Sequence, residues 1–215
     1  MIIIKQLTKM KIIRYILGFM MAVGITLSMS AAETADGMLK KAAAAINGAG
    51  GLTASFTLDY GQQKMTGTLK ASGRKFALQT STASTWYDGK NMWTYNAGSN
   101  ETTLMVPTPQ EVAEANPLSI VNSYASTFTA AFAKSQAKGS KTIVLTPKSK
   151  KSGYKSVHVT IPARASFPSK LVVIPSSGQK ITVSISQVKT GQKLAESSFI
   201  YPETKYPKAE IVDLR

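Results

Sequence analysis

The stretch that decides the fold is LTASFTLDYGQQKMTGTLKA at residues 52–71. Apolar and polar side chains alternate along residues 52–60, and they alternate again along residues 64–71 after a turn that begins at Gly61. A period of two places successive side chains on opposite faces of a strand. The stretch therefore predicts two antiparallel strands joined as a hairpin, with one apolar and one polar face.

The same alternation predicts further strands on both sides of an interruption. We expect them at residues 75–80, 82–87, 92–96, 102–106, 143–146, 154–161, 169–174, 180–188 and 209–214. A short helix is expected before the first strand, with Thr34 or Asp36 as its cap and an end at Asn47-Gly48. These elements predict a sheet of about eleven strands preceded by one helix.

The interruption at residues 107–138 predicts a helical insertion, because the alternation disappears there. Asn116-Pro117 resembles an N-cap followed by proline at the first helical position. One apolar stripe is expected on one helix or on two, made of Leu118, Val121, Ala125, Phe128 and Phe132. The fold class expected is mainly β (α+β): a strongly curved antiparallel sheet or unclosed β-barrel with helices on its concave side.

The inward face of this sheet is expected to carry large apolar side chains: Leu52, Phe56, Leu58, Tyr60, Met65, Leu69, Phe76, Leu78, Trp93, Tyr95 and Leu104. The periodicity is equally compatible with a packed core and with a cavity, since a curved sheet of this size commonly holds apolar ligands.

The first 32 residues predict a secretory signal peptide. Four basic residues precede an uncharged apolar run at residues 15–29, and small residues follow at Ser30 and Ala32. That run is shorter than the roughly 20 apolar residues of a membrane span. We expect cleavage between Ala32 and Glu33, with cleavage after Ser30 as the alternative, which leaves residues 33–215 as one exported domain.

Composition excludes several classes of site. The 215 residues include 26 Lys+Arg, 11 Asp+Glu, one His and no Cys, which rules out disulfides, thiolate metal sites and a lipidated N-terminal cysteine. The charge is strongly basic, and an exported basic protein meets anionic lipid rather than nucleic acid. Lysines on loops of a β-protein also serve solubility. No phosphate loop or dinucleotide motif occurs, so no cofactor is expected.

The sequence offers little for catalysis. His158 falls on the polar face of its predicted strand, and no Gly-x-Ser-x-Gly elbow is present. Glu111 and Glu114 are the closest pair of carboxylates on any one element, near a helix start where negative charge is favourable anyway. We therefore expect no enzyme; an enzyme in a lipocalin-like barrel and a basic surface protein without a cavity are the alternatives from other classes.

Several segments resemble the LolA-type periplasmic carriers. The most specific is Trp-Tyr-Asp-Gly-Lys-Asn-Met-Trp-Thr-Tyr-Asn at residues 86–96, which follows an Ala-Ser-Phe strand in the expected order. The others are Leu-Thr-Ala-Ser-Phe-Thr (52–57), Gly-Thr-Leu (67–69), Lys-Phe (75–76), Asn-Pro-Leu (116–118), Ile-Val-Leu-Thr-Pro-Lys (143–148) and Phe-Ile-Tyr-Pro (199–202). Together they span nearly all of residues 33–215.

The resemblance implies an unclosed barrel lined with apolar side chains, a helical lid and no catalytic centre. It implies a soluble periplasmic monomer that shields the acyl chains of lipoproteins in its cavity and moves them from the inner to the outer membrane. The implied partners are acylated lipoproteins, an inner-membrane lipoprotein-releasing transporter and an outer-membrane receptor. Absence of an N-terminal cysteine favours the carrier over the lipid-anchored receptor, and a carrier of free lipid or glycolipid is the alternative.

Two sets of residues receive roles from the resemblance. Leu118, Val121, Phe128 and Phe132 would belong to the lid. Arg74 is the nearest match to an arginine that pins the lid closed through backbone carbonyls in the family, although no proline follows it here.

Overall fold

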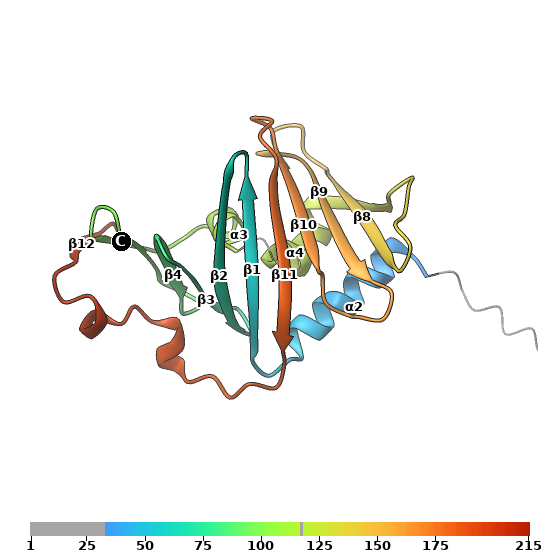
Figure 1. Cartoon of the computed structure of the whole chain (residues 1–215). Coiled ribbons are helices and arrows are strands. Elements are labelled where there is room, and N and C mark those ends of the chain that lie inside the picture. Colours follow the sequence, from blue (N-terminus) through green and yellow to red (C-terminus); the bar gives the residue numbers. More distant parts are fainter. Residues whose placement is uncertain (1–32, 117) are drawn as a thin grey trace, which may run out of the picture. The chain divides into compact units, whose positions relative to one another are not determined.

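The computed structural model describes residues 33–116 and 118–215, so the expected signal peptide lies outside the described residues. Within these ranges the chain forms three α-helices and one 12-stranded sheet (Figure 1). The helices are α2 (Ala35–Asn47), α3 (Pro109–Ala115) and α4 (Ser119–Thr127), with two 3-10 turns, η1 (Glu196–Phe199) and η2 (Glu203–Lys205). The strands are β1 (Leu52–Tyr60), β2 (Gln63–Ser72), β3 (Lys75–Thr80), β4 (Ala83–Tyr87), β5 (Met92–Asn96), β6 (Glu101–Met105), β7 (Phe128–Phe132), β8 (Ser140–Pro147), β9 (Tyr154–Pro162), β10 (Lys170–Pro175), β11 (Ile181–Lys189) and β12 (Glu210–Asp213).

The sheet is open and almost entirely antiparallel. Its strand order is β12-β6-β5-β4-β3-β2-β1-β11-β10-β9-β8-β7, and only the pairing of β12 with β6 is parallel. The two edge strands, β12 and β7, are not paired with each other, so the sheet does not close into a barrel. The mainly β, unclosed antiparallel fold predicted from the alternation is confirmed.

Helix α2 begins and ends where the capping residues predict. Thr34 is its N-cap, and the Thr34 hydroxyl accepts a hydrogen bond of 3.0 Å from the backbone N–H of Gly37. Leu39, Ala42 and Ile46 are buried along one side of the helix. This side packs against α4 and β7, so α2 belongs to the cover of one face of the sheet.

The helical insertion differs from its prediction in two ways. Helix α3 begins at a capping box formed by Thr108 and Glu111, whereas Asn116 is the C-cap of α3. The predicted helical stripe is wrong beyond Thr127, because Phe128 and Phe132 lie in strand β7. Residues 128, 130 and 132 are Phe, Ala and Phe, and Thr129 and Ala131 lie between them, which fits a strand. Pairing with β8 satisfies the backbone groups of this segment, and the chain therefore forms a strand here instead of continuing the helix. Strand β7 was not among the predicted strands.

We call the sheet face that packs against α2 and α4 the inner face, and the opposite one the outer face. Register places Leu58 beside Met65, and Leu69 beside Leu78, on the inner face. Helices α3 and α4 lie behind strands β2, β1 and β11 in Figure 1. A single cluster joins this face to the helices; its fully buried members include Leu39, Val121, Ile143, Leu145, Val157, Val159 and Leu171.

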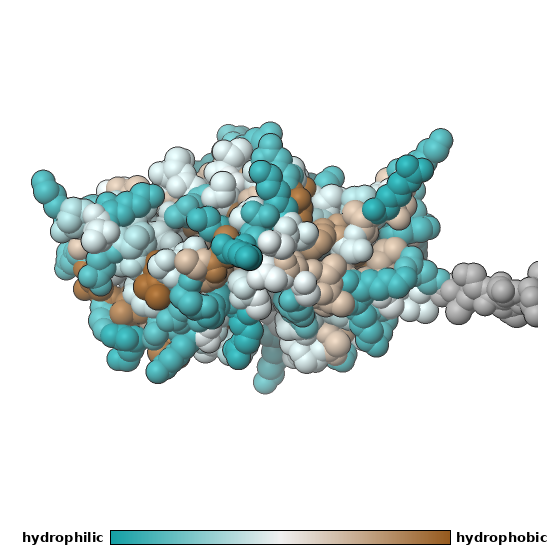
Figure 2. Space-filling model, turned by 90° about the horizontal axis from the view of Figure 1, so that it is seen from below, coloured by the Kyte–Doolittle hydropathy of each residue, from teal (hydrophilic) through white to brown (hydrophobic). Residues whose placement is uncertain are grey.

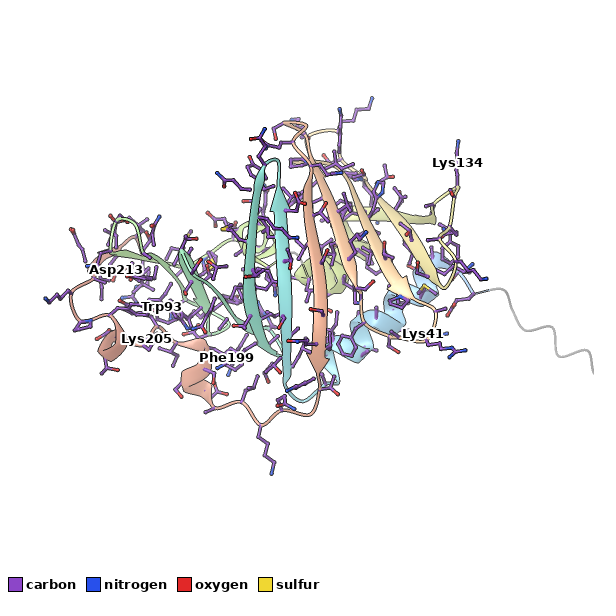
Figure 3. All side chains as sticks on the ribbon, viewed as in Figure 1. Lys41, Trp93, Lys134, Phe199, Lys205 and Asp213 are labelled. Atoms are coloured by element: carbon purple, nitrogen blue, oxygen red, sulfur yellow. The ribbon has the colours of Figure 1, made fainter. Side chains whose placement is uncertain are left out.

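The outer face is covered only in part, by the chain that follows β11. This segment carries η1 and η2, packs η1 on β3 and β4, and then adds β12 beside β6. Trp93 and Phe199 lie between the strands and this segment (Figure 3), and Lys75 forms a salt bridge with Glu196 of η1. The cluster on this face consists of Ala77, Trp86, Phe199 and Tyr201 with Trp93, Tyr95, Leu194 and Tyr206 packed around them.

The surface seen from below is mainly hydrophilic, and hydrophobic residues show through in separate patches (Figure 2). The large apolar side chains with high exposure are Tyr60, Val106, Ile200, Ile211 and Leu214. Isolated exposed apolar residues are ordinary on protein surfaces. The apolar residues that carry the fold are therefore those of the two interior clusters.

Candidate ligand-binding site

A cavity of about 410 Å³, here called the first cavity, lies between the inner face and α3. The sheet supplies most of its wall, and α3 supplies Ala113, Glu114 and Ala115. The large apolar side chains that the sheet contributes to it are Phe56, Leu58, Met65, Leu69, Leu78, Leu171, Val173, Ile181, Val183 and Ile185. A mostly apolar cavity of this volume falls in the range that holds small ligands.

The strand pattern explains why these side chains meet. Residues two apart on a strand share a face, and directly paired residues on neighbouring strands lie side by side. Phe56 is paired with Gly67 on one side and Ile185 on the other. A Cβ added at Gly67 would come within 2.5 Å of the Phe56 ring, so glycine leaves the space over which this ring lies.

A few polar groups interrupt the apolar wall of the first cavity. The Tyr154 hydroxyl is buried and has no hydrogen-bond partner among the described residues. Burial, and then the negative charge of Glu114, raise the pKa of Tyr154, so this hydroxyl is neutral at physiological pH. Glu114 accepts a hydrogen bond of 2.9 Å from the Gln110 side chain. The arrangement of an apolar wall with few polar groups is typical of ligand sites.

A second cavity, of about 370 Å³, lies farther along the same inner face. Its apolar wall consists of Ile46, Leu52, Ala71, Phe76, Tyr87 and Val112. Arg74 lines it as well, together with Asn122 and Ser123 of α4. Asn116 and Leu118 line both cavities, so the connection between α3 and α4 stands between them.

The predicted cavity residues divide between these places. Five of them line the first cavity: Phe56, Leu58, Met65, Leu69 and Leu78. Leu52 and Phe76 line the second cavity. Tyr60 is paired with Ile181 on the same face but is 40% exposed.

The remaining three, Trp93, Tyr95 and Leu104, lie on the outer face, so their predicted inward orientation is wrong. Trp93 pairs directly with Trp86 and with Leu104, and Trp86 packs under the C-terminal segment. Both faces of β4 and β5 are covered, and apolar residues therefore occur on both. Alternation separates the two faces but does not tell which one is inward.

The predicted lid residues also divide. Leu118 and Val121 are buried at the start of α4, at 8% and 0% exposure, and the Tyr124 hydroxyl donates a 2.5 Å hydrogen bond to the Asp36 carboxylate of α2. Phe128 and Phe132 belong to the sheet, as described above. Arg74 is exposed at the second cavity, and no hydrogen bond or ion pair joins it to another described residue.

Asn116, Tyr154 and Val112 were absent from the expected site. Asn116 was predicted as a helix cap and belonged to the Asn-Pro-Leu segment of the family resemblance, whereas Tyr154 was predicted only as the first residue of a strand. The sequence places Asn116 in the helical insertion and Tyr154 directly after the Ser152-Gly153 turn. Neither position indicates a cavity, because a cavity depends on how the helices lie on the sheet.

The single histidine of the chain lines neither cavity. His158 lies on the outer face, between Val144 and Val172 on the neighbouring strands. Within the described ranges, no three His, Asp or Glu side chains come together as metal ligands would. None of the helices in that part of the chain combines the length and apolar character that crossing a bilayer requires.

An open antiparallel sheet with apolar cavities beneath a helical cover defines a class of β-proteins with an internal site for apolar ligands. The chain belongs to the LolA family within that class, because the family profile described as "Outer membrane lipoprotein carrier protein LolA" matches residues 8–179. The predicted family resemblance is thereby confirmed.

Solved structures that are similar to this chain come from several bacteria. An uncharacterized conserved protein from Thermus thermophilus is 13% identical, with a TM-score of 0.53 over 82% of this chain and 96% of that chain. A LolA superfamily protein from Nitrosomonas europaea is 10% identical, with a TM-score of 0.44 over 78% of this chain and 98% of that chain. The comparison with curated proteins finds no match.

Proposed function

We propose that this protein is a periplasmic carrier that shields the acyl chains of lipoproteins in its apolar cavities and moves them from the inner to the outer membrane. The observation that carries the proposal is the first cavity of about 410 Å³, whose wall is mainly apolar. Membership of the LolA family supports the choice of lipoproteins as cargo.

The physical need for such a cavity is clear. Each methylene group of an acyl chain costs roughly 0.8 kcal/mol when it is exposed to water, so a lipid-modified protein does not cross an aqueous compartment unaided. A carrier must also release its cargo, and its cavity should therefore hold the chains about as well as a bilayer does. A cover of two short helices, α3 and α4, is suited to open and close over the site.

The partners follow from this role. They would be acylated lipoproteins, an inner-membrane transporter that releases them and an outer-membrane receptor that takes them up. The carrier would act as a monomer, without cofactor and without catalysis. The amino-terminal 32 residues would direct export and be removed.

The test is native mass spectrometry of the mature chain, taken gently from the periplasm of its own host, with the bound species then released and identified. The expected result is a mass shift that matches an acylated protein. A mass shift equal to that of one lipid would show that the cargo is a free lipid or glycolipid and not a lipoprotein. An empty chain that also ignores apolar fluorescent probes would contradict both.

Arg74 provides a second test, of the cover. It lines the second cavity together with Asn122 and Ser123 of α4, and a guanidinium there is suited to bond the closed cover in one state and to leave it in another. Arg74→Leu is expected to impair loading or release by at least several-fold, measured as transfer of an acylated protein, with little change in thermal stability. Arg164→Leu, at another exposed arginine, is the matched control. Wild-type transfer by Arg74→Leu would remove the latch role.

A further inference from the structure

We propose that one end of the sheet docks on the surface of a bilayer that contains anionic phospholipid. The docking surface, here called the lysine end, is formed by four exposed side chains: Lys150, Lys151, Lys155 and Lys180. Docking goes beyond the carrier function, because it concerns the outside of the molecule and does not depend on what the cavities hold. Three observations support it: the distribution of charge along the chain, the contact between two turns and the residue types of those turns.

Residues 33–215 carry their excess of positive charge in one stretch. Residues 115–195 contain 12 Lys and Arg and no Asp or Glu, whereas residues 33–114 contain seven basic and seven acidic residues. Residues 196–215 contain three basic and four acidic residues. The stretch without carboxylates forms α4 and strands β7 to β11. Solubility is served by interspersed charges of both signs, so a field of one sign over one part of the sheet indicates a partner of opposite sign.

Two turns of this stretch lie side by side at the same end of the sheet (Figure 1). They are residues 148–153, between β8 and β9, and residues 176–180, between β10 and β11. The backbone N–H of Ser176 donates a 2.9 Å hydrogen bond to the carbonyl of Gly153. The Ser176 hydroxyl donates a second hydrogen bond of 2.9 Å to the carbonyl of Ser152. The lysines of both turns therefore share one surface.

The charges of the lysine end are not neutralised by the residues that the structure describes. The salt bridges among those residues lie elsewhere, at Lys40, Lys41, Lys75 and Arg215. The adjoining turn between β1 and β2 adds no net charge, because Asp59 pairs directly with Lys64. Lys148 is engaged, since its ammonium donates a 2.6 Å hydrogen bond to the carbonyl of Ala125. The four side chains of the lysine end are thus available to an external anion.

The residue types of the two turns favour a lipid surface over a protein. Residues 148–153 and 176–180 contain only Lys, Ser, Gly and Gln. Protein interfaces are enriched in aromatic residues, Met and Arg and depleted in Lys, and their affinity depends on buried anchors, which these turns lack. A lysine ammonium is a point charge on a flexible stem, which suits phosphates that move in the plane of a bilayer. Each Lys near an anionic membrane surface strengthens binding by about fivefold.

The experiment measures binding of the mature chain, cleared of bound lipid, to vesicles by co-sedimentation. The vesicles contain phosphatidylcholine alone, or phosphatidylcholine and phosphatidylglycerol in equal parts. Four lysines at about fivefold each should strengthen binding to the anionic vesicles by roughly several hundred-fold over the neutral ones. The difference should shrink as the ionic strength rises from about 0.01 to 0.15 M, because the Debye length falls from about 30 to 8 Å.

A matched pair of double variants locates the docking surface. Lys151→Glu/Lys180→Glu reverses one exposed charge on each turn and should weaken binding to the anionic vesicles by at least about 25-fold. Lys90→Glu/Lys208→Glu makes the same change in net charge at exposed residues outside the stretch 115–195. This control should weaken binding by less than about fivefold, since screening limits the effect of charges outside the docking surface.

Equal losses in the two double variants would overturn the proposal, since net charge and not the lysine end would then attract the chain to lipid. Equal binding of the wild-type chain to neutral and anionic vesicles at low ionic strength would overturn it as well, and would leave an acidic protein as the alternative partner. Neither outcome contradicts the carrier function, which is measured separately as transfer of an acylated protein. Circular dichroism verifies folding, and the corresponding Gln variants replace a Glu variant that does not fold, with an expected loss of about 25-fold at the lysine end.

Discussion

The inner and outer faces of this sheet are filled in different ways. On the outer face, Trp86 is 2% exposed and its ring packs edge-on against Tyr201 with centroids 5.5 Å apart, while Tyr201 stacks on Tyr206 at 5.6 Å. On the inner face, aliphatic side chains such as Leu58 and Leu69 border cavities instead. One alternating sequence thus supplies a close-packed face and a hollow one.

The difference lies in what covers each face. The outer cluster is covered by a continuous segment that is fixed at both ends, by β11 and by β12, and by the salt bridge from Lys75 to Glu196. The hollow part of the inner face is covered by α3 and α4, of 7 and 9 residues. Helices this short are marginal without tertiary contacts. The part of the cover over the cavities therefore depends on its tertiary contacts, such as those of α4 with α2 and β7.

Trp86→Ala should produce the largest loss of stability, because it opens a void in the close-packed outer cluster. We expect a decrease of about 3–5 kcal/mol in the free energy of unfolding, measured by urea denaturation. The affinity for acyl probes should change little in the fraction that remains folded, since Trp86 lines neither cavity.

Leu78→Ala is the matched control on the inner face. Leu78 is half-buried and already borders the first cavity, so truncation enlarges an existing space rather than creating a closed one. We expect a loss well below that of Trp86→Ala, together with a changed preference for chain length. Equal losses for the two variants would contradict the distinction between a packed and a hollow face.

Thr108→Ala should have an intermediate effect, confined to the cover. The Thr108 hydroxyl accepts a hydrogen bond from the backbone N–H of Glu111. The Glu111 carboxylate in turn accepts a hydrogen bond from the backbone N–H of Thr108. Loss of such a cap costs about 1 kcal/mol. Because α3 lines both cavities, fraying of its first turn should speed the exchange of a bound acyl probe.

Thr34→Ala removes the same type of cap from α2, where Thr34 accepts from Gly37. A similar cost of about 1 kcal/mol is expected there, without faster exchange, since the first turn of α2 lines neither cavity. Faster exchange in both variants, by the same factor, would show that global stability rather than the cover governs release.

The strands were the most predictable part of the fold. Strands β3 and β5 have the bounds that the alternation indicates, residues 75–80 and 92–96. Local alternation suffices there because hairpin partners are neighbours in sequence. The parallel pairing of β12 with β6 joins residues more than 100 positions apart, and no local pattern specifies it.

The site was less predictable, for physical reasons. Phe128 and Phe132 are four residues apart, a spacing that places them on one face of a helix or of a strand equally well. Only pairing with β8 decides that this segment is a strand. Trp93 belongs to the cluster that the C-terminal segment covers, and Leu104 is its direct partner on β6, which a pattern within β5 or β6 does not reveal. Whether Val112 or Ala113 enters a given cavity depends on the orientation of α3 on the sheet.

The smallest effect concerns the hydrogen bond that joins α4 to the neighbouring helix α2, from the Tyr124 hydroxyl to the Asp36 carboxylate. Hydrogen bonds from Lys40 and Tyr124 lower the pKa of Asp36. Burial, and then the hydrogen bond with Asp36, raise the pKa of Tyr124 to about 12. Both shifts favour the state in which Asp36 is charged and Tyr124 is neutral.

The pKa shifts of Asp36 and Tyr124 define the pH range in which the link between α2 and α4 is stable. Because the Asp36 pKa is depressed on folding, its contribution is full above the ordinary Asp pKa of about 3.9 and is lost as pH falls further. Because the Tyr124 pKa is raised, its contribution is full below about pH 10 and is lost as pH rises toward 12. The link between α2 and α4 should therefore be constant from about pH 5 to pH 9 and weaken on both sides.

Tyr124→Phe isolates this link from all other titrations. Subtracting the stability of the variant from that of the wild-type chain, measured by urea unfolding at each pH, cancels groups such as Glu111 and Tyr154 whose pKa values are also shifted. The difference should form a plateau at neutral pH, smaller than the effect of Thr108→Ala, and fall toward both extremes. The fall at high pH is the sharper test, because it requires the ionisable hydroxyl that the variant lacks. A stability difference that stays flat up to pH 12 would mean that Tyr124 stabilises α4 through the packing of its ring alone. The contact between α4 and α2 would then resemble the packed aromatic cluster of the outer face.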